Sequence, residues 1–279
     1  MPTYRYTLVD VFTDRPLAGN QLAVFTDARE IPDAQLQALA RELNFSETAF
    51  VYPPAADGHV RLRIFTPTME LPFAGHPMLG TAFVLAVPLS LDEIRLETGA
   101  GLVPVRLQRE GPRIVFGWME QPLPSWQPYE QEDELLAALG VESSALPVEV
   151  YDLGPTHAYV LLHDEAAVAA VEPNLGRLAH LDVGANCVAG SRRHWKTRMF
   201  APAHGVPEDP ATGSAAGPLA VHLARHGRIA WGDEIEISQG AELGRPSTLH
   251  ARAQGSGDRV ERVEVGGSAV IVARGEFRL

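Results

Sequence analysis

Three short motifs occur twice along the chain, in the same order and at nearly constant separation. One such match is easily produced by chance, but three collinear matches indicate an internal duplication. The pairs are 63–67 with 198–202 (R-[I/M]-F-x-P, 135 residues apart), 76–82 with 209–215 ([H/D]-P-x-x-G-[T/S]-A, 133 apart) and 98–102 with 239–243 (141 apart). Since this period is too long for a solenoid, the sequence predicts two similar domains.

The spacing of apolar residues gives each half several strands and one strongly apolar helix. Such a helix needs cover on all sides, so we expect a curved sheet wrapped around it. The predicted fold class is α+β, with two pseudo-symmetric domains, each a curled, barrel-like, mostly antiparallel sheet around a central helix. We expect strands at 4–12, 22–25, 47–52, 60–65, 94–97, 103–107 and 114–118, and helices at 31–43, 77–87 and 210–225.

The domain boundary is expected at a proline-rich segment, residues 121–128. The first domain would comprise residues 1–118, completed by a C-terminal strand at 268–279, and the second would comprise residues 119–267. Each half would then carry one copy of the three repeated motifs.

Composition excludes several classes of protein. The net charge of -12 disfavours nucleic acid and anionic membrane as partners. No apolar run approaches the ~20 residues of a membrane span, and the first residues alternate like a strand rather than a signal peptide, so we expect a cytoplasmic protein. The single cysteine, Cys187, forms no internal disulfide and no pair of thiols, and no Cys/His cluster with zinc spacing is evident, so no metal is expected.

The second repeated motif has the composition of a helix start. Asp209 is a favoured N-cap and Pro210 a favoured first helical residue. A helix start presents free N–H groups and the positive end of the helix dipole, which together form an anion site. Gly213 would let a ligand approach the backbone and Ser214 would add a hydroxyl. His76 begins the other copy, with Gly80 and Thr81 in the same places.

If the two halves face each other, these two helix starts would hold a small carboxylate without lysine or arginine. The simpler interpretation is that Asp-Pro and His-Pro only cap helices. The duplication favours a functional role.

Glu47 is the third element of the predicted site. On the strand expected here it shares a face with Phe45, Ala49 and Val51. A buried carboxylate has a raised pKa and suits general acid/base catalysis. The alternative register places Glu47 in solvent with Phe50 inward, and the spacing leaves both open.

Several motifs together resemble the PhzF family of phenazine-biosynthesis-type isomerases. They cover nearly the whole chain, and FSETAFV, FAGHP and DPATGSA in combination are highly specific. The quoted segments are LAGNQLAV at 17–24, NFSET at 44–48, FAGHP at 73–77 and DPATGSA at 209–215. The chain departs from the family's common pattern at Gln21, where proline is usual.

The resemblance implies the fold of diaminopimelate epimerase, with the active site between two similar domains, and a homodimer without a cofactor. It implies proton transfer and a double-bond shift on trans-2,3-dihydro-3-hydroxyanthranilate or a similar small carboxylate. The catalytic residues would be Glu47, His76 and Asp209. Substrate-binding residues would be Ser46, Gly75, Gly213, Ser214 and Asn20.

Three other activities remain open at this stage. A thiol-independent amino-acid epimerase would use the same base and anion site, whereas a two-thiol racemase is excluded by the single cysteine. A non-catalytic binding protein would not need a buried base. A hydrolase built from Ser214, His76 and Asp209 lacks a G-x-S-x-G elbow. His157 is a further candidate for the cleft, and Cys187 is expected to be a small buried residue.

Overall fold

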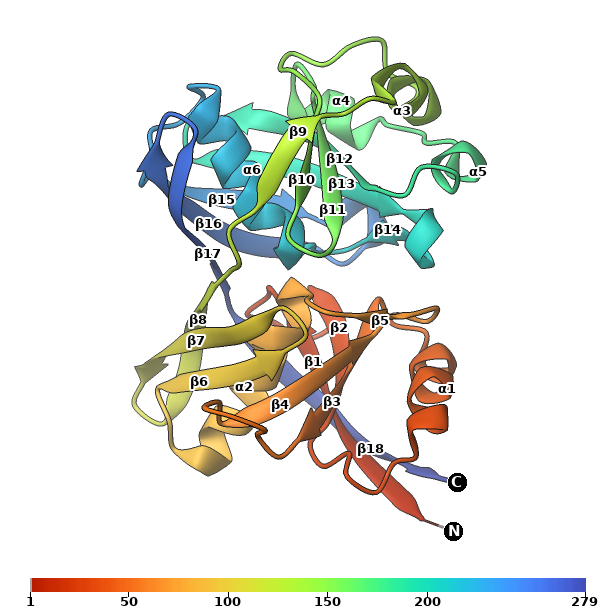
Figure 1. Cartoon of the computed structure of the whole chain (residues 1–279), viewed down its shortest axis with the longest axis vertical. Coiled ribbons are helices and arrows are strands. Elements are labelled where there is room, and N and C mark those ends of the chain that lie inside the picture. The colour runs from red at the N-terminus through yellow and green to blue at the C-terminus, as the bar shows by residue number, and fades with distance from the viewer. Residues whose placement is uncertain (1) are drawn as a thin grey trace. The chain divides into compact units, whose positions relative to one another are not determined.

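The computed structural model describes residues 2–279, which divide into two compact units. The first unit comprises residues up to 120 together with 266–279, and the second comprises residues 121–265. Figure 1 shows the elements of both units, which are described separately below. None of the helices in residues 2–279 combines the length and apolar character that a membrane crossing requires.

In the first unit the strands form a mixed sheet with strand order β18-β1-β2-β3-β4-β6-β7-β8. The pairs β2–β3 and β4–β6 are parallel and the others in this series are antiparallel. The elements are β1 (Thr3–Val11), β2 (Asn20–Phe25), α1 (Asp33–Leu43), β3 (Glu47–Tyr52), β4 (Val60–Phe65), β5 (Glu70–Leu71), α2 (Gly75–Leu89), β6 (Glu93–Thr98), β7 (Gly101–Glu110), β8 (Arg113–Glu120) and β18 (Ala269–Arg278).

Helix α2 is the central helix of this unit. Its residues from Gly75 to Ala86 are all buried, and it contacts β1, β2, β3, β6, β7, β8 and β18. An apolar helix covered on all sides is what the sequence predicted for this segment. Helix α1 covers another part of the sheet, with Leu36, Leu39 and Ala40 buried at helical spacing, and it ends where Asn44 adopts a left-handed conformation.

The second unit has strand order β9-β10-β11-β12-β13-β15-β16, with β11–β12 and β13–β15 parallel and the others in this series antiparallel. From β10 on, the succession of antiparallel and parallel pairings repeats that of the first unit from β1 on. The elements are β9 (Ser125–Pro128), α3 (Glu132–Leu139), β10 (Glu149–Asp152), β11 (Thr156–Leu161), α4 (Glu165–Ala169), α5 (Leu175–Leu178), β12 (Gly184–Ser191), β13 (His194–Ala201), β14 (Val206–Asp209), α6 (Gly213–Arg225), β15 (Glu234–Gln239), β16 (Ser247–Ser256) and β17 (Arg259–Gly267), with 3-10 helices at Pro202–His204 and Ala241–Leu243.

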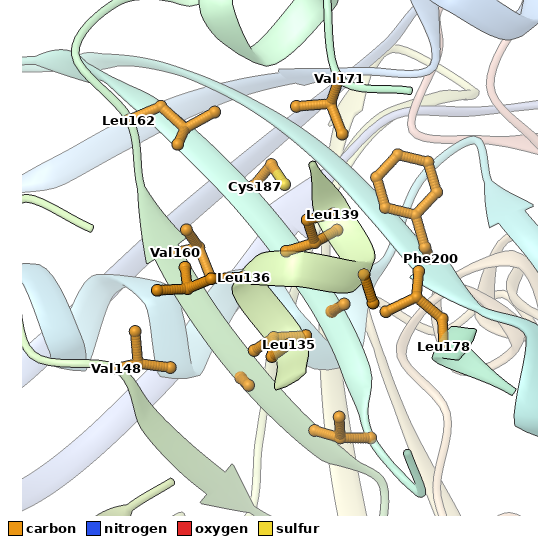
Figure 2. Packing of buried hydrophobic residues seen from close by; sticks show 14 of the residues in the cluster. Leu135, Leu136, Leu139, Val148, Val160, Leu162, Val171, Leu178, Cys187 and Phe200 are labelled. Atoms are coloured by element: carbon orange, nitrogen blue, oxygen red, sulfur yellow. The ribbon is translucent and has the colours of Figure 1, made fainter. Parts of the chain in front are cut away.

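One hydrophobic core of the second unit lies between its sheet and helices α3, α4 and α5, on residues that do not include the central helix α6. Figure 2 shows Leu135, Leu136 and Leu139 of α3 beside Val160 of β11 and Cys187 of β12. Cys187 is fully buried, and burial raises the pKa of its thiol to about 12. It is therefore a packing residue and not a nucleophile, as the sequence predicted.

Residues 121–128, expected to be a boundary segment, contribute ordered structure to the second unit. Strand β9 pairs with β10. Gln121 is buried, and its Nε2 donates to the carbonyl of Gly213 at 2.8 Å. The segment begins where the second unit begins, at residue 121, and the strand that its prolines flank pairs at the edge of the sheet, where proline is tolerated.

The first repeated motif has the same role in both units. Arg63 on β4 makes a two-bond contact with Glu70 on β5, at 2.7 and 2.8 Å. Arg198 on β13 makes the same contact with Glu208 on β14, at 2.8 and 3.0 Å. Each guanidinium also lies over the ring of the phenylalanine two residues ahead. The R-x-F repeat therefore fastens a short strand to the sheet just before each central helix begins.

Candidate functional site

The central helices do not begin where the sequence predicted. Helix α6 begins at Gly213 with Thr212 as its N-cap, so Asp209 ends β14 and is not the cap. The cause is Gln239, whose Nε2 donates to the Asp209 carbonyl at 2.8 Å and to Thr212 Oγ1 at 2.9 Å, while its Oε1 accepts from the Thr212 amide at 3.1 Å. These bonds hold residues 209–212 outside the helix. Similarly, α2 begins at Gly75, and His76 lies inside its first turn.

The helix entrances are therefore related by a different alignment from the one read in the sequence. The shared pattern is Pro-x-x-Gly, at Pro72 and Gly75 in the first unit and at Pro210 and Gly213 in the second, 138 residues apart. The third repeated motif packs on these prolines. A Cβ on Gly99 would lie 2.9 Å from Pro72 Cα.

In this alignment His76 corresponds to Ser214 and not to Asp209. Gly80 therefore no longer aligns with Gly213, the glycine that was predicted to let a ligand approach the backbone. A Cβ there would lie 2.7 Å from Leu22 Cδ2 and 2.8 Å from Val11 Cγ2, so Gly80 allows the helix to pack closely on β1 and β2.

Five predicted site residues of the first unit lie together at the start of α2. His76 Nδ1 lies 3.3 Å from Glu47 Oε2 and 3.3 Å from Asn20 Nδ2. Ser46 Oγ donates to Asn20 Oδ1 at 3.2 Å. Gly75 adds its backbone as the first residue of the helix. The residues come from β2, from the start of β3 and from α2. Strands β2 and β3 are neighbours in the sheet, and α2 contacts both of them.

His76 is buried, and burial lowers the pKa of its imidazole from 6.5 to about 3. Near pH 7 the ring is therefore neutral, and the 3.3 Å approach of Nδ1 to Glu47 Oε2 is not an ion pair. A proton on Nδ1 would be donated to Glu47, whereas a bare Nδ1 would accept from Asn20. Since Nε2 has no hydrogen-bond partner among residues 2–279, the state with a bare Nδ1 would place the ring proton on a buried nitrogen without an acceptor.

The strand pattern around Glu47 explains why the sequence left its orientation open. Residues Thr48 to Val51 are buried on both faces of β3, because Phe50 packs in the cluster under α1 while Ala49 and Val51 are also inaccessible. Glu47 starts the strand, and its side chain is 15% exposed. Alternation could not settle a strand covered on both sides.

The predicted site residues of the second unit form two contacts near the start of α6. Asp209 is buried and its Oδ2 accepts from Thr212 Oγ1 at 2.7 Å. Ser214 Oγ lies 3.0 Å from His157 Nε2, and burial lowers the pKa of His157 to about 3. Within the second unit, the histidine that contacts Ser214 is His157.

Each helix start presents donors that suit an anion. By helix geometry the first-turn amides of Gly75 and His76, and of Gly213 and Ser214, have no acceptor within their own helices. Pro77 removes one further donor in α2. Each helix start by itself therefore has the donors that the sequence predicted for binding an anion, and in the second unit they lie a few residues from where they were predicted.

One group with the composition of a metal site lies apart from these residues and was missed from the sequence. Glu149, His222 and His226 bring ligand atoms within 4.8 Å of one another. The spacing of four residues between the histidines was the available signal. Arg225 Nη1 lies 2.7 Å from the same Glu149 oxygen, so the arginine already supplies the cation at this group.

Comparison with known proteins extends over the whole chain. Residues 9–275 match the PhzC-PhzF family, described as phenazine biosynthesis-like protein. The trans-2,3-dihydro-3-hydroxyanthranilate isomerase of Pseudomonas aeruginosa is 50% identical over 277 residues, covering 99% of this chain and all of the relative. The enzyme of the same name from Pseudomonas chlororaphis is 48% identical with the same coverage.

Solved structures agree in fold. A PhzF-family phenazine biosynthesis protein from Bacillus anthracis superposes with a TM-score of 0.87 at 23% identity, over 100% of both chains. A hydroxyproline epimerase from Agrobacterium vitis superposes with a TM-score of 0.67 at 13% identity, over 99% of this chain and 91% of that one. These similarities confirm the predicted mixed, mostly sheet fold of the epimerase type, and the curated relatives confirm the predicted class of isomerase. The chain belongs to the PhzC-PhzF family of phenazine biosynthesis-like proteins.

Proposed function

We propose that this protein isomerises trans-2,3-dihydro-3-hydroxyanthranilate, or a closely similar small carboxylate, by acid/base proton transfer. The observation that carries the proposal is the Glu47 carboxylate held 3.3 Å from the neutral, buried imidazole of His76 at the start of α2. The full-length similarity to enzymes named for this reaction supports the choice of substrate.

In the proposed reaction Glu47 accepts the proton from a carbon next to the unsaturated system of the substrate. The electron pair of the broken C–H bond moves into that system, and the helix-start amides stabilise the developing negative charge. Protonated Glu47 then gives the proton to another carbon, where a new C–H bond forms and the double bonds end in their shifted positions. Positioned acid/base groups of this kind contribute ~10²–10⁴-fold to rate.

His76 and Asp209 have supporting roles in this proposal. His76 Nδ1 lies 3.3 Å from both Glu47 Oε2 and Asn20 Nδ2, so its ring is placed to respond to the change in charge of Glu47. Asp209, fixed by Thr212, and Ser214 are proposed to serve the same substrate molecule as Glu47. Ser46 and Asn20 orient His76, and Gly75 and Gly213 contribute backbone donors.

The finer features of the fold are proposals of the same kind. We propose that the two compact units are the duplicated halves expected from the sequence, each with a curled sheet around its central helix. The repeated order of strand pairings and the 138-residue separation of the Pro-x-x-Gly segments support this. The homodimer, the cytoplasmic location and the predicted domain limits remain predictions.

Proton NMR in D₂O tests the proposed function. Wild type, Glu47→Gln and Glu42→Gln would each be incubated with dihydrohydroxyanthranilate and, separately, with a panel of amino acids. Glu42 is an exposed glutamate on α1, so its variant is a control for loss of one charge in the same unit. We expect product with incorporated deuterium for wild type and Glu42→Gln, and at least ~10²-fold slower turnover for Glu47→Gln.

Two other results would change the conclusion. Deuterium entering the α-carbon of an amino acid, with inversion and no shifted double bond, would identify a thiol-independent epimerase. Ligand binding without exchange into any compound would support a binding protein on this fold. Equal turnover by Glu47→Gln would remove Glu47 from the mechanism.

A further inference from the structure

The side chain of His157 is buried in the second unit, where its imidazole contacts the hydroxyl of Ser214. It lies near the start of β11, is 3% exposed, and its Nε2 is 3.0 Å from Ser214 Oγ. Its other nitrogen, Nδ1, has no hydrogen-bond partner among residues 2–279. The neighbouring strand leaves room for the ring only because residue 184 is glycine, since a Cβ there would lie 2.7 Å from Nδ1.

The position of the ring proton determines which way the Ser214 hydroxyl points. Because burial keeps the imidazole neutral near pH 7, it carries a single N–H. With the proton on Nδ1, a buried donor would have no acceptor and Ser214 would donate to the ring. With the proton on Nε2, the ring donates to Oγ and the hydroxyl hydrogen is available to another acceptor. The second state is favoured, because buried donors without acceptors are rarer than acceptors without donors.

We propose that His157 is a positioning residue that donates from Nε2 to Ser214 Oγ and so holds the Ser214 hydroxyl as a hydrogen-bond donor toward the substrate. The proposal rests on the proposed function, because it takes Ser214 to be a substrate-binding residue. Together with the amides of Gly213 and Ser214, this hydroxyl gives the start of α6 three hydrogen-bond donors. Three such donors favour a carboxylate or an oxyanion of the substrate.

The first unit has a parallel arrangement that supports this reading. There Asn20, at the start of β2, lies 3.3 Å from His76, which is the second residue of α2. His157 and Ser214 occupy the matching strand start and the second residue of α6. In both units a polar side chain from the strand start therefore fixes the hydrogen bonding of the second residue of the central helix.

Kinetics of a double-mutant cycle test the proposal on dihydrohydroxyanthranilate. We expect His157→Leu to raise KM by about tenfold with a smaller change in kcat, because one substrate hydrogen bond is lost. His157→Gln, whose amide can still donate to Oγ, should recover most of the affinity. In a Ser214→Ala background, His157→Leu should change KM by no more than about twofold. An equal effect in both backgrounds would show a merely structural role and overturn the proposal.

If His157→Leu fails to fold, Gly184→Ala replaces it in the same cycle. The added methyl group would lie 2.7 Å from Nδ1 and so push the imidazole ring of His157 away. The side chains of His157 and Ser214 themselves are unchanged. We expect it to raise KM in wild type and to have little further effect with Ser214→Ala. An unchanged KM in the folded Gly184→Ala variant would contradict the proposal.

The tautomer of His157 is measurable without any substrate. Long-range ¹H–¹⁵N NMR of the histidine-labelled protein, with the His157 signal identified by its loss in His157→Gln, should show a protonated Nε2 and a bare Nδ1 between about pH 5 and 8. The opposite tautomer would overturn the proposal. If wild type does not convert the substrate but the tautomer is as expected, the proposed function fails while the orientation of the hydroxyl stands.

Discussion

Gly240 links the third repeated motif to the start of α6, and replacing it should damage both stability and activity. Its φ is +78°, where an alanine costs about 1 kcal/mol or slightly more. A Cβ would also lie 2.5 Å from the Pro210 carbonyl oxygen and would overlap the Arg245 carbonyl oxygen. Both are backbone atoms, so relieving the overlap moves the chain that leads into Gly213. Overpacking of this kind adds ~1–3 kcal/mol, giving a total loss of about 2–4 kcal/mol for Gly240→Ala.

Gly244 provides a matched control in the same turn. Its φ is +68°, but a Cβ there meets nothing within 4 Å. Gly244→Ala should therefore lose only the ~1 kcal/mol of the left-handed conformation and keep its activity. Equilibrium urea unfolding, followed by circular dichroism, and steady-state turnover would be measured on both variants. Equal free energies of unfolding for the two would refute the reasoning from close backbone approach.

Three further predictions follow from contacts in the two units. Burial lowers the pKa of both His76 and His157 from 6.5 to about 3, so between these pH values the unfolded chain binds protons that the folded chain does not. The free energy of unfolding should therefore fall as pH falls through this range. In urea titrations at several pH values, His157→Gln should reduce the slope of this dependence by up to ~1.4 kcal/mol per pH unit. Arg198→Lys should lower the free energy of unfolding by about 2 kcal/mol, because the guanidinium, whose side chain is only 9% exposed, loses its two-bond contact with Glu208. Arg63 is more exposed, so Arg63→Lys should lower it by less than ~1 kcal/mol. Equal losses for the two variants in thermal unfolding would contradict this prediction. Asn20→Ala should lower kcat at least ~10-fold by releasing His76, and an unchanged kcat would remove Asn20 from the site.

The sequence was sufficient for features that depend on local pattern. The bounds of β3 and β4, the buried central helices and the duplicated R-x-F motif follow from periodicity and repetition, which are written in consecutive residues. The motifs around Glu47, His76 and Asp209 also identified the family, because their combination is specific.

Contacts between residues distant in the chain decided the rest. Asp209 has the composition of an N-cap, but Gln239 holds residues 209–212 outside the helix, and no local rule could anticipate that partner. The sequence aligned the two helix starts 133 residues apart, whereas the structure relates them at 138. The sequence could not show this, because it does not say that Gly99 packs on Pro72 and Gly240 on Pro210. The pairing of His157 with Ser214 required strand β11 to lie beside the start of α6. Periodicity and capping act over a few residues, whereas the orientation of a catalytic side chain depends on whichever distant group completes its hydrogen bonds.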